Sequence, residues 1–303
     1  MIDPRTAAPK MGRAAIASVL VALTLVVAKG AAWIFSGSVA LLGSWIDSLL
    51  DLMASLVNLV AVRTAVAPPD KEHRFGHGKA EAIAGMFQSS AIMISAAYLL
   101  YASAGRLIDP QPVLNGGWAI GVSVLAILLT AGLVGFQKKV VRETGSIAIE
   151  ADSLHYTGDL LLNLVVIAAI AVSSFAGITQ ADGLFGLGIA VYLAGSAWRI
   201  SRNSIDMLMD REFPESEREA IFNLVMGNKN VLGLHDLKTR QSGLYSFIQM
   251  HIELEPELSL YDAHHIADEV EATVGERFPN AEIIIHTDPF GLEDPAHLDD
   301  QLI

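Results

Sequence analysis

Long apolar stretches alternate with short polar connections over the first two thirds of the chain. Each stretch is close to the roughly 20 residues that a helix needs to cross the hydrocarbon core of a bilayer. The pattern therefore predicts six membrane-spanning helices, with both ends of the bundle on the same side of the membrane. These helices are expected at residues 13–35, 38–65, 81–107, 117–142, 146–176 and 183–205.

The pattern changes after Asp210 to the shorter periodicities of a soluble domain. Helical spacing of apolar residues alternates there with the period of two that is typical of strands. We expect a small α+β domain in the order helix, strand, strand, helix, strand (αββαβ). The helices are expected at 213–228 and 259–278, and the strands at 235–241, 245–254 and 281–287.

The fold class expected from these patterns is an α-helical membrane protein: a six-helix transmembrane bundle followed by a small cytoplasmic α+β domain. We place the transmembrane domain at 1–210 and the cytoplasmic domain at 211–290. Residues 291–303 form an acidic tail whose composition is typical of disorder.

Basic residues gather in the connections on one side of the predicted membrane domain. Loops that stay in the cytoplasm carry an excess of Lys and Arg, so both termini and the soluble domain are expected there. The loops on the other side, around Gly37, 109–117 and 177–182, are nearly free of basic residues. The basic residues on the cytoplasmic side are Arg5, Lys10, Arg13, Lys71, Arg74, Lys79, Lys138, Lys139, Arg142, Arg199, Arg202 and Arg211.

Composition and charge narrow the range of functions. Of the 303 residues 52% are hydrophobic and only 17% are charged, whereas about a quarter is usual in a soluble domain. The net charge of −13 is uneven, because residues 1–205 carry +2 and residues 206–303 carry −15. An acidic domain is a poor partner for nucleic acid and a good one for cations. The absence of Cys excludes disulfides, thiolate metal sites and Cys nucleophiles.

Charged residues lie inside two of the predicted spans. Asp47 and Asp51 are four residues apart on the second span, and His155 and Asp159 repeat this spacing on the fifth. Each pair therefore projects from one helical face. A carboxylate at the bilayer centre costs on the order of 2.5–3.5 kcal/mol, so such residues normally serve a function. Alternatively, these groups satisfy one another or pair with Lys29, although one lysine neutralises only one carboxylate.

Three carboxylates and one imidazole would converge if these two helices faced each other. Four such ligands suit a divalent transition metal with a tetrahedral preference, for which Zn²⁺ is the first choice. Cd²⁺, Fe²⁺ and Mn²⁺ remain open as transported ions. Because metal and protons compete for these ligands, alternating exposure of the site would exchange one for the other.

Two further groups of metal-capable residues lie outside the predicted spans. Asp70, His73 and His77 occupy a short loop bounded by Pro and Gly, where an ordinary solvated loop is an equally good interpretation. The soluble domain has polar strand faces that carry His residues, which indicates metal binding on the sheet surface, the alternative being ordinary exposed histidines. The candidate ligands in this domain are His235, His251, His264, His286 and Asp288.

Several motifs resemble those of the cation diffusion facilitator family. They are SVALLGSWIDSLLD at 38–51, RFGHGKAE at 74–81, HYTGD at 155–159, DLKTRQSG at 236–243 and IIHTDP at 284–289. The similarity covers nearly the whole chain and is strongest to the bacterial zinc and ferrous-iron exporters of that family. It implies a homodimeric, proton-coupled exporter of the bacterial inner membrane with a metallochaperone-like cytoplasmic domain.

The resemblance also assigns roles to particular residues. It makes Asp47, Asp51, His155 and Asp159 the transport site. It further implies a loop site at Asp70, His73 and His77, and a binuclear site at the cytoplasmic dimer interface that uses His235, His251, His264, His286 and Asp288. Only the resemblance points to Lys79 and Asp210, as a charge pair between subunits.

Two other classes of function remain open at this point. One is a metal sensor that the spans merely anchor, but an anchor does not require buried carboxylates. The other is an intramembrane metalloenzyme. That class is disfavoured because the chain lacks His-Glu-x-x-His and its four ligands would leave no open metal position. We therefore expect a transporter without catalytic residues rather than an enzyme.

Overall fold

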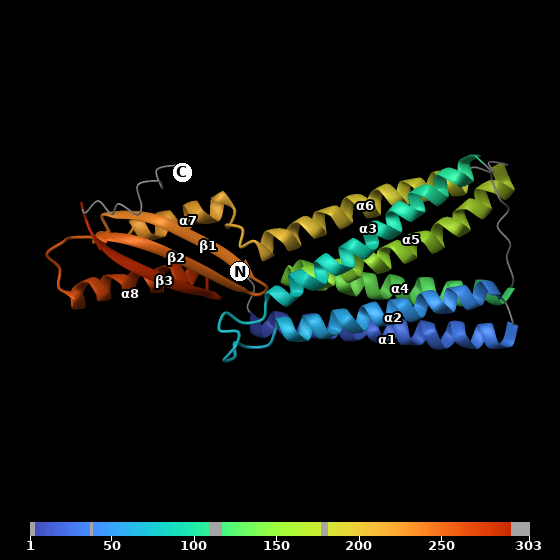
Figure 1. Cartoon of the computed structure of the whole chain (residues 1–303), viewed down its shortest axis with the longest axis horizontal. Helices are drawn as coiled ribbons and strands as arrows, with labels where there is room; N and C mark the ends of the chain where they lie inside the picture. Colours follow the sequence, from blue (N-terminus) through green and yellow to red (C-terminus); the bar gives the residue numbers. More distant parts are fainter. Residues whose placement is uncertain (1–3, 37–38, 109–116, 177–180, 292–303) are drawn as a thin grey trace. The chain divides into compact units, whose positions relative to one another are not determined.

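The computed structural model describes residues 4–36, 39–108, 117–176 and 181–291 (Figure 1). The chain divides into two compact units, one of residues 7–205 and one of residues 206–303 together with the first six. The predicted tail at 291–303 lies outside the described residues, apart from Gly291.

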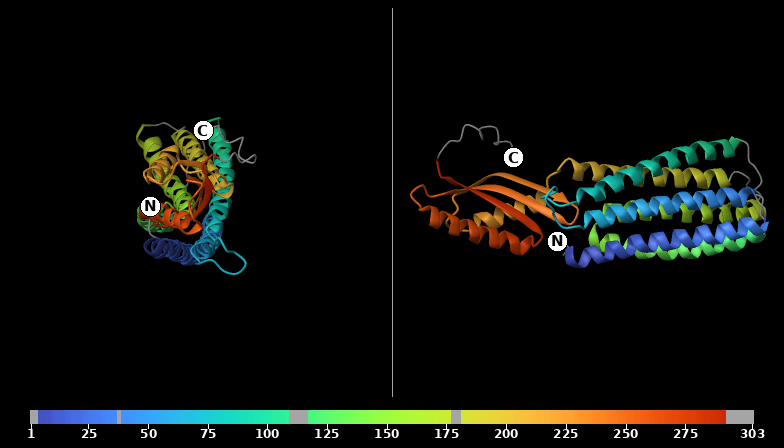
Figure 2. Two further views of the ribbon diagram at one scale, coloured as in Figure 1. Left: turned by 90° about the vertical axis from the view of Figure 1, so that its left-hand side faces the viewer. Right: turned by 60° about the horizontal axis from the view of Figure 1, so that its bottom comes forward.

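The larger unit is a bundle of six helices that run side by side (Figures 1 and 2). Each contains between 27 and 33 residues, which is more than the roughly 20 needed to cross a bilayer. The order and positions of the six helices agree with the prediction. They are α1 (Pro4–Ser36), α2 (Val39–Ala65), α3 (Lys79–Ile108), α4 (Gly117–Thr144), α5 (Ile147–Ala176) and α6 (Ala181–Leu208).

The bundle has an apolar outer surface. Val27, Ile94 and Leu128 are between 64% and 73% exposed, as expected of side chains that contact lipid. Five of the helices, all except α5, contain a described stretch long and apolar enough to cross a membrane. Part of α5 has side chains outside the described residues. The chain is a multi-pass membrane protein.

Glycines allow α3 and α6 to approach each other closely. A Cβ atom added at Gly186 would lie 2.2 Å from Oγ and 3.2 Å from Cβ of Ser103 on α3. One added at Gly183 would lie 2.9 Å from the side chain of Leu107. Small residues at helix contacts are the usual means of tight packing in membranes, where no hydrophobic effect drives helices together.

The smaller unit has a three-stranded sheet with the strand order β1-β2-β3. β1 pairs with β2 in antiparallel fashion and β2 pairs with β3 in parallel, so that His251 lies between His235 and His286 in the register. This arrangement confirms the αββαβ prediction. The elements are α7 (Glu215–Met226), β1 (Gly233–Ser242), β2 (Tyr245–Leu254), α8 (Leu260–Arg277) and β3 (Ala281–Pro289).

The two helices of this unit cover one face of the sheet (Figure 2). Ile248, Met250 and Ile252 of β2 point into a core that also contains Ile221 of α7 and Val270 of α8. The intervening residues of β2, which include His251, therefore point to the opposite face. The alternation along β2 is thus the one that the sequence predicts.

The close approach of α3 and α6 leads to a prediction about stability. Gly186→Val would place side-chain atoms where Ser103 now lies, and overpacking of this kind typically costs about 1–3 kcal/mol. We expect thermal unfolding of the full-length protein in detergent to occur at a lower temperature. Gly188→Val is the matched control, because it makes the same Gly-to-Val change within α6 and therefore has the same effect on helix propensity. Nothing lies within 4 Å of a Cβ at this position. Equal melting temperatures for the two variants would contradict the packing role.

Candidate metal centres

A group of metal-capable side chains lies between α2 and α5 inside the bundle. Nε2 of His155 lies 3.0 Å from Oδ1 of Asp51 and 3.7 Å from Oδ2 of Asp159. One ligand atom from each of the three residues falls within 4.8 Å of the others. We refer to Asp51, His155 and Asp159 as the transmembrane cluster.

The distances between His155 and the two carboxylates allow the cluster either to share a proton or to bind a metal ion. Two atoms bound to one tetrahedral Zn²⁺ at 2.0–2.2 Å lie about 3.3–3.6 Å apart, and the observed 3.0 and 3.7 Å are close to this range. The shorter distance is also that of an ordinary hydrogen bond. The same nitrogen can therefore share a proton with Asp51 or, after a small displacement, bind a metal together with it.

Asp47 does not belong to this group. It lies one helical turn before Asp51 on α2 and has an exposed side chain, and the described cluster does not include it. The structure thus brings together three of the four residues singled out from the sequence for this site.

Buried polar residues around the transmembrane cluster tie α5 to the helices beside it. Asp152 is only 1% exposed, and its Oδ2 accepts hydrogen bonds from Oγ of Ser18 on α1 at 2.5 Å and Nε2 of Gln137 on α4 at 2.7 Å. The hydroxyls of Tyr156 and Ser55 lie 2.7 Å apart and connect α5 to α2. These residues are not among those predicted from the sequence, although Asp152 carries the same signal as Asp159, a carboxylate within an apolar span.

The N-terminus of α5 is held by α3. The carboxylate of Glu81 accepts a hydrogen bond from Oγ of Ser146, and its Oε1 lies 3.4 Å from the backbone nitrogen of Ala148. A buried carboxylate at a helix N-terminus is favourable because the first backbone N–H groups lack partners within the helix. Since Glu81 is only 2% exposed, this contact fixes the start of the helix that carries His155.

The second group lies in the loop between α2 and α3. Asp70 is its centre: Oδ1 lies 3.4 Å from Nδ1 of His73, and Oδ2 lies 3.2 Å from Nε2 of His77. The backbone N–H of His73 donates to Oδ1 at 2.6 Å, and this hydrogen bond holds the pKa of Asp70 below its ordinary value. The loop therefore presents an ionised carboxylate between two imidazoles, all three within 4.8 Å.

The third group lies on the open face of the cytoplasmic sheet. Asp288 of β3 contacts histidines of the two other strands: its Oδ2 lies 2.9 Å from Nδ1 of His251 and 3.5 Å from Nε2 of His235. Oδ1 of the same carboxylate lies 3.1 Å from Nε2 of His286. We call His235, His251, His286 and Asp288 the sheet cluster.

The sheet cluster differs from the sequence prediction at two positions. His264 lies on α8, where its side chain is 74% exposed and faces Asp268 at 3.7 Å, so it is not part of the cluster within one chain. Asp236 was not singled out, yet its Oδ2 lies 3.6 Å from Nε2 of His251. It adopts a left-handed backbone conformation (φ 53°) at an irregularity in β1, which the residue alternation does not reveal.

Lys79 and Asp210 belong to different compact units. Within its own unit, Asp210 lies 3.3 Å from a guanidinium nitrogen of Arg240. The inter-subunit pairing of Lys79 and Asp210 stays a prediction.

A multi-pass helical bundle with Asp and His side chains gathered inside it, joined to a small α+β domain, defines a membrane transporter of metal cations. Comparison with known families agrees, since residues 15–209 match the cation efflux transmembrane domain and residues 213–290 match the cytoplasmic domain of cation efflux proteins. The chain belongs to the cation efflux, or cation diffusion facilitator, family. It is a transporter of divalent cations rather than an enzyme.

The chain is similar to curated relatives over nearly its whole length. The cation-efflux pump FieF of Salmonella newport (strain SL254) is 45% identical over 279 residues, which cover 92% of this chain and 93% of the relative. FieF of Salmonella typhimurium (strain LT2) gives the same values.

Solved structures of domains from related transporters match about a quarter of the chain. The metal-bound C-terminal domain of the CzcD transporter from Thermotoga maritima is 27% identical, with a TM-score of 0.25, and the match covers 27% of this chain and all of that one. The cytosolic domain of a cation diffusion facilitator family protein is 28% identical, with a TM-score of 0.24, covering 25% of this chain and 93% of that one.

Proposed function

We propose that this protein exports Zn²⁺ from the cytoplasm in exchange for protons. The observation that carries this proposal is the transmembrane cluster, in which His155 lies within 3.7 Å of carboxylates from two helices inside an apolar bundle. The single imidazole favours Zn²⁺ over Mg²⁺, which prefers oxygen ligands alone. Fe²⁺, Cd²⁺ and Mn²⁺ can use the same ligands and are proposed as alternative cargo.

The exchange follows from the chemistry of the ligands. Zn²⁺ binds the neutral imidazole and the ionised carboxylates, so protons leave the cluster when the metal enters. Protonation on the other side of the membrane reverses this step and releases the metal. Alternating access then couples the two flows. Asp47 lies outside the transmembrane cluster in this structure, one helical turn from Asp51, and is proposed to turn inward and complete a tetrahedral site with Asp51, His155 and Asp159 when the metal binds.

The other two groups are proposed as further metal sites outside the transmembrane cluster. Asp70, His73 and His77 form an exposed loop site next to the start of α3. The sheet cluster and His264 form the cytoplasmic site at the interface of a homodimer, and Lys79 of one subunit pairs with Asp210 of the other. The proposed domain boundaries are 1–210, 211–290 and 291–303. Both termini are proposed to be cytoplasmic in the bacterial inner membrane.

The transport site is tested by removing one ligand. Asp51→Asn keeps the shape of the side chain but removes the charge that binds metal, so Zn²⁺ flux should fall about 100-fold or more. The loss of even an outer-shell partner typically costs 10- to 100-fold in metal affinity or activity. Zn²⁺ uptake into sealed proteoliposomes under an imposed pH gradient measures the effect.

Glu143→Gln is the matched control for this experiment. It makes the same chemical change on α4, where Glu143 pairs with Lys10 at 2.9 Å outside the cluster. Flux should stay near the wild-type value. Wild-type flux through Asp51→Asn would refute the assignment of the site.

Proton coupling is tested at His155. Imidazole is the group that ordinarily titrates between pH 5 and 8, and its protonated form cannot bind metal. Zn²⁺ affinity of the wild type should therefore fall as the pH falls through this range, and the decline should be shallower in His155→Ala. The affinity is measured by calorimetry on protein whose other sites carry Asp70→Ala and His251→Ala. An unchanged slope would assign the exchanged protons to the carboxylates.

Dimerisation of the cytoplasmic domain should depend on Zn²⁺. Residues 206–303 carry −15, so two copies repel each other over the ~8 Å Debye length at physiological salt. Bound Zn²⁺ reduces this charge, and any ligand that prefers the dimer stabilises it by mass action. Sedimentation of residues 212–303 at several zinc concentrations should show tighter dimers with zinc.

The histidines of the sheet cluster provide the specificity test for this effect. A His251→Ala, His286→Ala double variant should lose the response to zinc. His265→Ala, an exposed position of α8 that is not a proposed ligand, should keep it. If the double variant responds like the wild type, these histidines are ordinary surface residues.

A further inference from the structure

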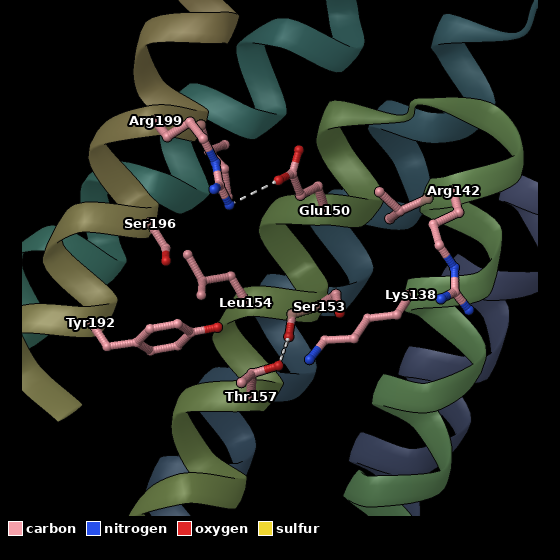
Figure 3. Close-up of a pocket in the computed structure, with 11 residues that line it drawn as sticks. Lys138, Arg142, Glu150, Ser153, Leu154, Thr157, Tyr192, Ser196 and Arg199 are labelled. Atoms are coloured by element: carbon pink, nitrogen blue, oxygen red, sulfur yellow. Dashed lines mark hydrogen bonds and ion pairs between the residues drawn. The ribbon is translucent and has the colours of Figure 1, made fainter.

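A pocket of about 290 Å³ lies between α4, α5 and α6, on a part of the bundle that the proposed transport mechanism does not use (Figure 3). Its lining comes from the last two turns of α4, the first three turns of α5 and the adjoining part of α6. It therefore lies near the turn that joins α4 to α5, at the end of the bundle where the basic residues gather. The charged and polar side chains that line it include Lys138, Arg142, Glu150, Ser153, Tyr192 and Arg199.

The lining has an excess of positive charge. It contains three basic side chains and one acidic side chain. The acidic side chain, Glu150, forms an ion pair with Arg199 at 3.5 Å. Lys138 and Arg142 form no ion pair with any residue that the structure describes. A pocket with this charge repels divalent metal cations and attracts anions.

A buried hydroxyl group also lies beside these basic side chains. Ser153 is 4% exposed and lines the pocket, yet its Oγ has no hydrogen-bond partner among the described residues. Buried hydroxyls are rarely left without a partner, because the lost hydrogen bonds with water cost free energy. The oxygen itself is buried, so an anion in the pocket would accept a hydrogen bond from this hydroxyl after the Ser153 side chain rotates toward it.

The remainder of the lining combines the hydroxyl residues Thr157 and Ser196 with an apolar part. In the apolar part Leu154 and Ile200 are buried, and Tyr192 is 46% exposed. A ligand that fits must combine an anionic group with hydrocarbon. The volume is at the lower end of the roughly 300–1,000 Å³ of small-molecule sites, which suits a headgroup better than a complete lipid.

We propose that this pocket binds the headgroup of an anionic phospholipid, with its phosphate at Lys138, Arg142 and Ser153. Basic pockets between transmembrane helices on the cytoplasmic side are known to hold anionic lipid headgroups. Tyr192 and Leu154 contact the start of the acyl chains, which extend into the bilayer. The lipid screens the unpaired cations and connects the ends of α4, α5 and α6, so it stabilises the bundle when it binds.

The proposal is tested with the full-length protein in detergent and short-chain phosphatidylglycerol as the probe. Binding is counted by native mass spectrometry, and stability is followed by thermal unfolding. Phosphatidylglycerol should bind saturably and raise the melting temperature. Phosphatidylcholine of the same chain length should bind at least tenfold more weakly, because its headgroup has no net charge.

Variants locate the site. Lys138→Gln combined with Arg142→Gln should weaken phosphatidylglycerol binding about tenfold or more, since each basic residue contributes separately to the attraction. Lys139→Gln combined with Arg202→Gln is the matched control, because it removes the same charge from exposed positions on α4 and α6 that do not line the pocket. Ser153→Ala leaves the charge intact and should weaken binding by a smaller factor, which gives a second measurement if the double variant does not fold.

Three results would overturn the proposal. Equal losses in the double variant and its control would mean that the lipid responds to general surface charge. Equal binding of phosphatidylglycerol and phosphatidylcholine would exclude recognition of the net charge. Displacement of phosphatidylglycerol by inorganic phosphate or glycerol 3-phosphate at matched concentration would show a site for free anions. The experiment does not depend on metal transport, so it stands apart from the proposed exchange of Zn²⁺ and protons.

Discussion

The need to pair the charged and imidazole side chains of α5 inside an apolar bundle is the constraint on which the rest of the transmembrane unit depends. Asp152, His155 and Asp159 lie within three turns of one another, and unpaired polar groups at this depth would each cost several kcal/mol. Asp152 is bonded to Ser18 of α1 and Gln137 of α4, and His155 to Asp51 of α2. Two further contacts hold α5, since Tyr156 pairs with Ser55 of α2 and Ser146 with Glu81 of α3. The network thus fixes α5 while leaving His155 to share a single hydrogen bond with Asp51.

The same combination of Asp and His recurs in three different environments. The transmembrane cluster has low-dielectric surroundings. In the loop, Asp70 is exposed and accepts hydrogen bonds from backbone N–H groups. On the sheet, Asp288 contacts histidines from three neighbouring strands. Environment decides how strongly a proton and a metal compete for such a group. The arrangement therefore places the same ligand types in one group inside the bundle and in two groups with more exposed members.

Side chains of opposite charge lie on different sides of α5. The transmembrane cluster faces α2 with carboxylates, whereas Ser153 and Leu154 face a pocket lined by Lys138 and Arg142 of α4. A cation attracted to the first is repelled by the second. This separation lets a divalent cation and an anionic headgroup interact with one helix without competing for the same space.

The sequence by itself determined the elements and their order, because apolar runs of membrane length and strands with alternating burial are local patterns. The αββαβ order and the inward face of β2 followed from these patterns. It also marked Asp51, His155 and Asp159, since charge within an apolar span is conspicuous. Tertiary structure alone decided what those residues meet. Asp47 stays outside the cluster, Asp236 approaches His251 through an irregularity in β1, and Lys138 and Arg142 line a pocket with α6. Such contacts join residues distant in the chain, and their geometry depends on how helices and strands pack, which periodicity does not encode.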